Sequence, residues 1–253
     1  MKVLSLAVEG LERAHGEGLL EWAFDQDADV ICFQDTGCSE YSLASNDFFP
    51  EEYHAYFADN YDNPKLNGVA IYCRKMPKAI MFGLGFMDFD HLGVYIQADY
   101  ENCSVGSILV PSAHGERGDK TLKLKFLNQL GAHLQKVRNK KRDFILCGGW
   151  ELAWLPQDAE ESGNRLDIPG FSNEERDWLG SLYRSGYTDA FREAEAEGDI
   201  YTWWPEGDDG PGIRTDTHII SDSLAPHVLS ASIDDEQAFS NHAPIIVDYE
   251  IDL

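Results

Sequence analysis

The segment from Asp143 to Leu155 constrains the fold more than any other part of this sequence. Its residues Phe144–Cys147 form a short apolar run between a basic segment and a pair of glycines, which is the pattern of a strand buried on both faces. In open α/β proteins, the polar side chains that do chemistry lie just past the carboxyl end of such a strand. Here that position holds Gly149, which has no side chain to bind a metal or move a proton. The sequence therefore predicts an α/β fold whose central strand ends at a nearly bare site.

Short apolar segments bounded by Gly, Pro and Asn predict further strands in the first half of the chain and again in its last quarter. We expect them at residues 2–8, 29–34, 53–59, 67–74, 78–84, 93–100, 103–110, 201–204, 214–220, 227–233 and 244–251. Apolar residues at helical spacing predict helices at residues 16–27, 120–138, 173–185 and 189–197. Two groups of strands with helices between them predict two packed sheets flanked by helices.

Length and composition indicate one folded unit. Of 253 residues, 43% are hydrophobic, which is enough for a sizeable core, and no stretch resembles a linker. We therefore expect a single domain over residues 1–253. No apolar run approaches about 18 residues, and the apolar start of the chain stops at Glu9, so we predict neither a membrane span nor a signal peptide. Five scattered cysteines without a CxxC pair indicate reduced, buried thiols and a cytoplasmic location.

Charge is distributed unevenly along the chain. The net charge is −25, which argues against a nucleic-acid partner, but the window from Arg117 to Arg142 carries +8 and the remainder carries −33. Its nine basic residues, against the single acid Asp119, are Arg117, Lys120, Lys123, Lys125, Lys136, Arg138, Lys140, Lys141 and Arg142. Such a run is either the solvated surface of a helix or a docking patch for a polyanion, and the contrast with so acidic a background favours the patch.

Several motifs resemble the exonuclease III branch of the endonuclease/exonuclease/phosphatase superfamily. They follow the same order along the whole chain and include MKVLSLAVEGL, DVICFQDT, NGVAIY, ILVPS, FILCGGWEL, YTWW and SNHAP. The resemblance implies a four-layer α/β sandwich that cleaves phosphodiester or phosphoester bonds with Mg²⁺. It also implies an acidic metal ligand after the second strand, an Asp-x-Asn after a central strand and a terminal Asp-His pair.

The residues at these positions depart from that chemistry. The matching positions, which we expect to form a vestigial site, hold Ala7, Glu9, Gln34, Asp35, Gly149, Glu151, Asp216, Asn241 and His242. Leu109 also stands where a tyrosine is expected. Asp35 could still bind Mg²⁺, but Gly149 cannot orient water, and Glu9 and Glu151 add negative charge where phosphates would lie. We therefore expect no catalysis and no metal or other cofactor.

A narrower resemblance points to regulation. GLLEW, ADVICFQDT, PKAIMFGLGF, KVRNKKRDFILCG and FSNHAPIIVDY are similar to the bacterial catabolite repression control proteins, which have this fold without the nuclease activity. The resemblance implies translational repression together with the RNA chaperone Hfq on A-rich mRNA, with weak RNA binding by the chain alone. The residues expected to contact RNA or the partner are Lys136, Arg138, Lys140, Lys141, Arg142 and Arg214.

Two other functions remain open at this point. One is an active, Mg²⁺-dependent exonuclease III-like DNA repair nuclease or phosphodiesterase, with Asp35 as the metal ligand and Glu151 as a replacement ligand. The other is an interaction module with no role in RNA binding. Simple structural roles are also expected: Trp203 and Trp204 in core packing, an Arg214–Asp216 ion pair, and His242 as a hydrogen-bonded loop residue.

Overall fold

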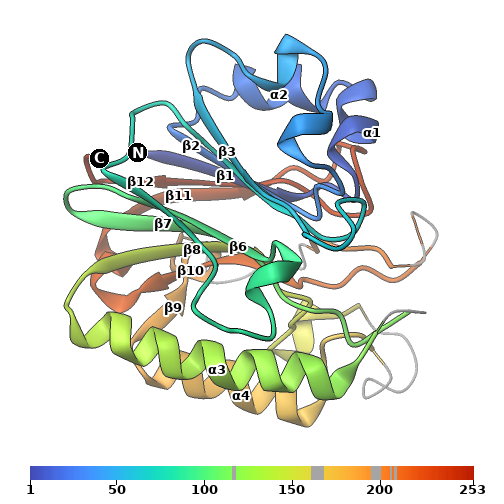
Figure 1. Ribbon diagram of the computed structural model, residues 1–253. Helices are drawn as coiled ribbons and strands as arrows, with labels where there is room; N and C mark the ends of the chain where they lie inside the picture. Colours follow the sequence, from blue (N-terminus) through green and yellow to red (C-terminus); the bar gives the residue numbers. More distant parts are fainter. Residues whose placement is uncertain (116–117, 161–167, 195–200, 206, 208–209) are drawn as a thin grey trace.

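The strands form two sheets packed face to face (Figure 1). The computed structural model describes residues 1–115, 118–160, 168–194, 201–205, 207 and 210–253, and within these residues each sheet has six strands. The first sheet has the order β11 (Val228–Ile233), β12 (Ile245–Tyr249), β1 (Lys2–Ala7), β2 (Val30–Gln34), β4 (Val69–Cys73) and β3 (His54–Ala58). The second has the order β5 (Ala79–Phe82), β6 (Tyr95–Asp99), β7 (Cys103–Leu109), β8 (Asp143–Gly149), β10 (Asp216–Ser221) and β9 (Tyr187–Asp189).

Helices cover the outer face of each sheet. Figure 1 shows α1 (Leu11–Gly16) and α2 (Leu19–Asp25) against the first sheet, and α3 (Lys120–Asn139) and α4 (Asn173–Arg184) against the second. A short helix α5 (Ala190–Ala194) follows β9. The connections contain the 3₁₀ turns η1 (Glu40–Ser42), η2 (Asn46–Phe48), η3 (Asp90–Leu92), η4 (Pro156–Asp158) and η6 (Asp222–His227). The predicted four-layer α/β sandwich is confirmed.

Strand β8 is buried on both faces, as its apolar run predicts. Ile145 and Cys147 point into the core between the two sheets, where they join Val3 and Cys32 of the first sheet. Phe144 belongs to the other core, between the second sheet and helices α3 and α4. The side chains of these residues are at most 1% exposed, so β8 offers no free face to solvent. Function must therefore be sought at its ends.

The longest helix begins and ends close to its predicted bounds. Asp119 caps α3, because its side chain accepts hydrogen bonds from the backbone N–H groups of Thr121 and Leu122. The buried ridge of the helix includes Phe126 and Leu130, which pack on the second sheet. The helix leads through Lys140–Arg142 directly into β8.

Three predicted elements differ from the structure. The helix expected at 16–27 is α2, which begins only at Leu19 because Gly18 before it adopts a left-handed backbone conformation with φ of 93°, and the preceding helix α1 was not predicted. The strand expected at 201–204 is reduced to isolated bridges from Trp203 to Ile213 and His242. The helix expected at 189–197 is described only to Ala194, and residues 195–197 lie outside the described residues. No helix among the described residues is long and apolar enough to cross a membrane.

Candidate functional site

The strand ends bring the expected site positions together. Ala7 and Gln34 are register partners at the ends of β1 and β2 in the first sheet. Gly149, at the end of β8 in the second sheet, faces both of them: a Cβ built on Gly149 would lie 3.6 Å from Ala7 Cβ and 3.8 Å from Gln34 Cβ. Leu109 and Asp216 flank Gly149 as its register partners on β7 and β10. The centre of the expected site is thus a methyl group, an amide and a glycine.

The amide at this centre is turned into the protein. Gln34 is 1% exposed, and its Nε2 donates hydrogen bonds to Ser107 Oγ at 2.8 Å and to the Cys32 carbonyl at 3.2 Å. Ser107 Oγ in turn donates to the Phe33 carbonyl. Because its donors are satisfied between the two sheets, Gln34 acts as an internal link.

Acidic residues stand just beyond the strand ends, in a strained backbone conformation. Glu9, Asp35 and Glu151 have φ values of 49°, 52° and 47°, a region that residues other than glycine seldom adopt. Such conformations cluster at functional sites, where the surrounding structure enforces them. The carboxylates are not gathered around one point: Glu9 Oε2 accepts from the Asn241 N–H, and Glu151 Oε2 accepts from Ser112 Oγ. The described residues contain no group of three or more His, Cys, Asp or Glu that could hold a metal ion.

A buried lysine fixes the segment after β8. The Lys123 side chain on α3 is 0% exposed, and its Nζ lies 2.7 Å from Glu175 Oε1 and donates to the Glu151 carbonyl at 2.7 Å. Burial acts to raise the pKa of Glu175, but the charge and hydrogen bond of Lys123, with the hydrogen bonds from Ser172, outweigh it and lower that pKa. Lys123 therefore belongs to the interior and not to the predicted basic patch. Its spacing of three, four and seven residues from Phe126, Leu127 and Leu130 was a signal of this burial.

The terminal histidine keeps a carboxylate partner. His242 Nδ1 lies 2.7 Å from Asp216 Oδ2, and the ring stacks on Trp203 with centroids 5.5 Å apart. Burial acts to lower the pKa of His242, but Asp216, followed by Glu9 and Glu151, outweighs it and raises that pKa. The expected packing of Trp203 in the interior is confirmed. The expected Arg214–Asp216 ion pair is wrong, because Asp216 pairs with His242.

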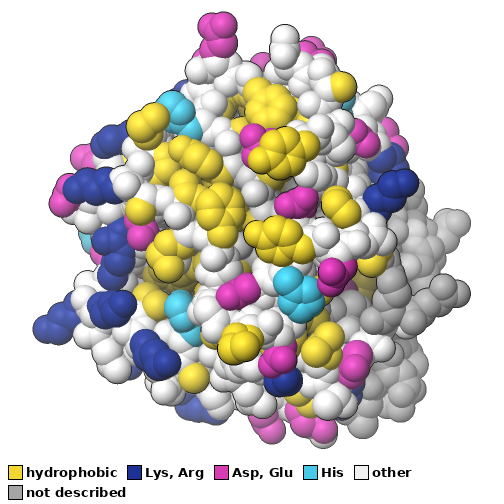
Figure 2. Space-filling model, in the orientation of Figure 1, with side chains coloured by type: hydrophobic (Ala, Val, Ile, Leu, Met, Phe, Trp, Pro, Cys, Tyr) yellow, Lys and Arg dark blue, Asp and Glu magenta, His cyan; other side chains and the backbone are white. Residues whose placement is uncertain are grey.

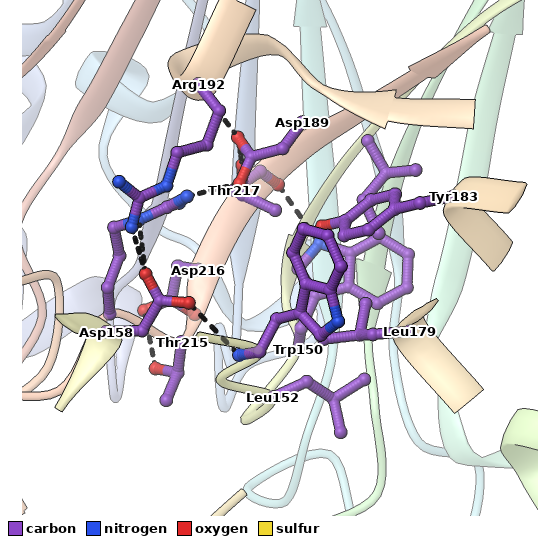
Figure 3. A pocket seen from close by; sticks show the side chains of 13 residues that line it. Trp150, Leu152, Asp158, Leu179, Tyr183, Asp189, Arg192, Thr215, Asp216 and Thr217 are labelled. Carbon is purple, nitrogen blue, oxygen red and sulfur yellow. Dashed lines mark hydrogen bonds and ion pairs between the residues drawn. The ribbon is translucent and has the colours of Figure 1, made fainter. Parts of the chain in front are cut away.

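Arg214 lies in a buried cluster of four charges. Arg214 pairs with Asp189 and Asp158, and Arg192 pairs with Asp158. Figure 3 shows Asp158, Asp189 and Arg192 of this cluster in the pocket that Trp150 and Tyr183 also line. Burial acts to lower the pKa of Arg214, but Asp189 and Asp158 outweigh it and raise that pKa. Because the Arg214 side chain is 5% exposed, the expectation that it contacts RNA is corrected to an internal, structural role.

The exposed basic surface is smaller than the sequence suggests. Arg142 donates to Ser104 Oγ at 2.5 Å and to the Tyr100 and Cys103 carbonyls at 2.6 and 2.9 Å, so it ties the β6–β7 hairpin. Its predicted role in RNA binding is corrected accordingly. Lys120 and Lys125 pair with Glu174 and Asp88, and Arg117 lies outside the described residues.

What remains is a lysine patch at the end of α3, which we define as Lys136, Lys140 and Lys141. All three are exposed and form no ion pair or side-chain hydrogen bond within the described residues. Arg138 lies beside them, with its guanidinium 3.9 Å from Asp222. Figure 2 shows Lys and Arg side chains gathered along the left margin of the molecule, the side on which α3 leads into β8 in Figure 1.

A cavity of about 460 Å³ opens beside the strand ends. It extends from Asp35 to Glu151 and is walled by the loops that follow β3, β5 and β7. Its lining residues include Asn60, Leu66, Asn67, Leu92, Val94, Leu109, Ser112, His114 and Leu122. The cavity is the space in which a ligand of this site would lie.

Comparison with known proteins agrees with this architecture. Residues 8–215 match the Endonuclease/Exonuclease/phosphatase family. The chain is similar to an exodeoxyribonuclease of Bacillus subtilis, with 28% identity over 97% of this chain and 98% of that protein. It is also similar to the DNA repair nuclease APEX1 of Danio rerio, with 30% identity over 97% of this chain and 81% of that protein.

Solved structures show the same fold at lower sequence identity. An AP endonuclease from Archaeoglobus fulgidus superposes with a TM-score of 0.85 at 23% identity, over 99% of this chain and 100% of that one. The 3′-5′ exonuclease NExo from Neisseria meningitidis superposes with a TM-score of 0.86 at 20% identity, over 99% and 100% of the two chains.

Proposed function

This chain belongs to the endonuclease/exonuclease/phosphatase family, and from that premise we propose that it is a member without nuclease activity that binds RNA. More specifically, we propose a cytoplasmic translational repressor that acts on A-rich mRNA together with the RNA chaperone Hfq. The similar proteins are exodeoxyribonucleases and DNA repair nucleases, so this chain is related to enzymes that act on nucleic acid.

The position of Gly149 is the observation that supports the proposed absence of nuclease activity. Its missing side chain faces Ala7 and Gln34, so β8 contributes no carboxylate at the point where the three strand ends converge. Hydrolysis of a phosphodiester needs a positioned water and an acidic metal site, and effects of groups that act as a unit are lost together when one is removed. The donors present at this point do not fit Mg²⁺, and we derive no step through a metal.

The acidic residues Glu9 and Glu151 also disfavour the binding of a phosphate at the strand-end site. Glu9 and Glu151 are close enough to raise the pKa of His242, and the buried Asp216 already neutralises that histidine when it is protonated. A phosphate placed here would meet more negative than positive charge. The phosphate contacts of RNA are therefore expected elsewhere on the surface.

The lysine patch of Lys136, Lys140 and Lys141 supports an RNA contact at the end of α3. Lys136 lies in the last turn of α3, and Lys140 and Lys141 lie in the turn that leads into the central strand β8. Three lysines on a protein with a net charge of −25 give weak binding alone, because the rest of the surface repels phosphates. A partner such as Hfq that supplies further phosphate contacts would make the complex stable.

A Mg²⁺-dependent exonuclease III-like nuclease is the second candidate. Its support is the Asp216–His242 pair at 2.7 Å, together with Asp35 and Glu151 at the two sides of the cavity. To separate the candidates, a duplex with an abasic site is incubated with the protein and Mg²⁺ or Mn²⁺. We expect no cleavage above background, whereas cleavage that disappears on Asp216→Asn would establish the nuclease.

A second experiment tests whether the lysine patch contributes to the complex with Hfq and A-rich RNA. Lys136→Glu, Lys140→Glu and Lys141→Glu together are compared with Lys65→Glu, Lys75→Glu and Lys78→Glu, which change the net charge equally at exposed sites elsewhere. Gel shifts with Hfq and an A-rich RNA are recorded at several salt concentrations. We expect the patch variant to lose the ternary complex or to flatten its salt slope by up to about three units, and the control to assemble. Wild-type assembly by the patch variant would contradict the proposal.

A further inference from the structure

The cavity beside the strand ends combines apolar walls with a polar edge. At about 460 Å³ it lies within the range of about 300–1,000 Å³ that small-molecule sites occupy. Leu66, Leu92, Val94, Leu109 and Leu122 supply the apolar lining, and Asp35, Asn60, Asn67 and Glu151 are among its polar residues. Such a lining fits a flat molecule with a hydrophobic face and hydrogen-bonding groups along its edge.

No positive charge faces this cavity from the described residues. Its described lining contains neither Lys nor Arg, and Lys123, which is 3.9 Å from Glu151 Oε2, is fully buried behind the lining. His114 Nε2 accepts a hydrogen bond from the Gly170 N–H, so that ring is neutral. Burial, followed by the charge of Lys123, also lowers the pKa of His114. Among the described residues, therefore, the charge at this cavity is negative and disfavours a phosphate or other anion.

An amide donor in the cavity lining lacks a partner. Asn60 is 4% exposed, and its Oδ1 accepts from the backbone N–H groups of Asp62 and Asn63 at 3.0 and 3.2 Å. Its Nδ2 makes no hydrogen bond within the described part of the chain. Because Asn60 lines the cavity and this N–H has no protein acceptor among the described residues, a ligand acceptor at this position could receive a hydrogen bond from it.

Acceptors outnumber this donor along the same edge. Asn67 Nδ2 donates to the Leu92 carbonyl at 3.4 Å, which leaves Asn67 Oδ1 as an acceptor, and Glu151 adds a carboxylate. A suitable ligand must therefore present an N–H₂ group, an adjacent acceptor and no negative charge. Adenine, cytosine and guanine carry an exocyclic amino group that carboxylates and amides recognise, whereas uracil has none.

We propose that this cavity binds an unpaired nucleobase that carries an exocyclic amino group. The base lies between the leucine side chains, its amino group donates to the acidic edge, and its ring acceptor receives the Asn60 N–H. Sugar and phosphate stay outside the cavity, away from Asp35 and Glu151. The inference deepens the proposed RNA-binding function. It rests on that function only for the assumption that the bound base belongs to an RNA. Binding of the base itself can be measured without RNA or Hfq.

Titration calorimetry with phosphate-free nucleosides is the direct test. We expect at least one of adenosine, cytidine and guanosine to bind about tenfold or more tightly than uridine, the discrimination that one good base-edge contact provides. The matching 5′-monophosphate should bind more weakly than its nucleoside, because the carboxylates repel it. Absence of binding by every nucleoside, or equal binding of uridine, would overturn the proposal.

Two variants locate the binding. Leu122→Trp fills the cavity from α3 and should abolish nucleoside binding, while Leu229→Trp, at a position on β11 that is 63% exposed, should leave it unchanged. Asn60→Asp keeps an oxygen for Asp62 and Asn63 but removes the donor, and should weaken binding about tenfold. Melting curves verify that each variant is folded. Unchanged nucleoside affinity in folded Leu122→Trp and Asn60→Asp would place the ligand elsewhere.

An RNA arm separates this inference from the proposed function. If nucleosides bind but the protein neither joins Hfq nor prefers oligo(A) over oligo(U), the cavity assignment stands and the repressor proposal fails. If the ternary complex forms but nucleosides do not bind and Leu122→Trp assembles normally, the repressor proposal stands and the cavity assignment fails.

Discussion

Two groups of charged residues lie close together on β10 and differ in their charge balance. Arg214, just before the strand, belongs to a buried cluster in which two arginines meet two aspartates. Asp216, two residues later, belongs to the strand-end site, where it faces His242 and the more distant Glu9 and Glu151. The first group is neutral as a whole and closed within itself. The second has an excess of negative charge and opens toward a cavity, so a ligand with hydrogen-bond donors could bind there.

The largest expected effect is in the balanced cluster. Arg214→Met removes the ion-pair partner of Asp189 and one of the two partners of Asp158, so the buried Asp189 carboxylate is left without a compensating charge. We expect a loss of about 3–5 kcal/mol in the free energy of unfolding, measured by urea denaturation. Arg184→Met, at an exposed position on α4, should change it by less than about 0.5 kcal/mol. Equal effects of the two substitutions would show that the cluster does not stabilise the fold.

The next largest expected effect is a loss of stability at acidic pH, and it comes from His218, a buried histidine on β10. His218 is 0% exposed, and its ring nitrogens lie 2.9 Å from Ser5 Oγ and 3.1 Å from the Tyr249 hydroxyl, between the two sheets. Burial lowers its pKa from 6.5 to about 3, since neither hydroxyl compensates a charged ring. The unfolded chain therefore binds the proton more readily, and stability falls as the pH drops from about 6.5 toward about 3.

For that single proton the slope approaches about 1.4 kcal/mol per pH unit. It is measured as the urea midpoint across the interval, for the wild type and for His218→Gln. The substitution should remove this part of the acid sensitivity even if it costs stability at neutral pH. An unchanged slope in His218→Gln would mean that other groups cause the acid loss.

His242 should respond to pH with the opposite sign. Its pKa is raised above 6.5 with Asp216 as partner, so its contribution is complete below 6.5 and is lost as the pH rises through the raised value. Asp216→Asn should therefore cost about 1.5–3 kcal/mol on the acidic side, the range for a charge-assisted hydrogen bond, and less on the alkaline side. Thermal melts at both ends of this range measure the difference. A cost that is the same at every pH would show that His242 is neutral in the folded protein.

The sequence predicted the architecture and the convergence of the site, but not the partners of its charges. The strand segments follow from short-range patterns, whereas the resemblance to the exonuclease III branch assigned Ala7, Gln34 and Gly149 to one site, where the structure places them together. Lys123 and Arg142 looked like members of one basic run, although Lys123 pairs with Glu175 inside the protein and Arg142 ties a hairpin. A charge that is buried by a partner distant in the sequence leaves only an indirect signal, such as the apolar spacing around Lys123.

The smallest expected effect concerns metal at the strand ends. Ligand-linked stabilisation reaches only about 0.4 kcal/mol when the metal concentration equals its Kd, so a weak site gives almost no shift in Tm. We expect no measurable rise with Mg²⁺ in the wild type, and a rise that Asp35→Asn abolishes would contradict this. Gly149→Asp sharpens the comparison, because a Cβ there has ordinary contacts to Ala7 and Gln34 and asks only a small shift of Leu109 Cδ1, at 3.3 Å.

The matched control for that substitution is Gly149→Asn, which has nearly the same shape but no charge. If the missing carboxylate is what removed metal binding, Gly149→Asp should gain a Mg²⁺-dependent rise in Tm and Gly149→Asn should not. The absence of one carboxylate side chain would then explain why the acidic residues at the strand ends form no metal site. If neither variant responds, the backbone positions of Asp35 and Glu151, both at positive φ, hold their carboxylates too far apart to share an ion.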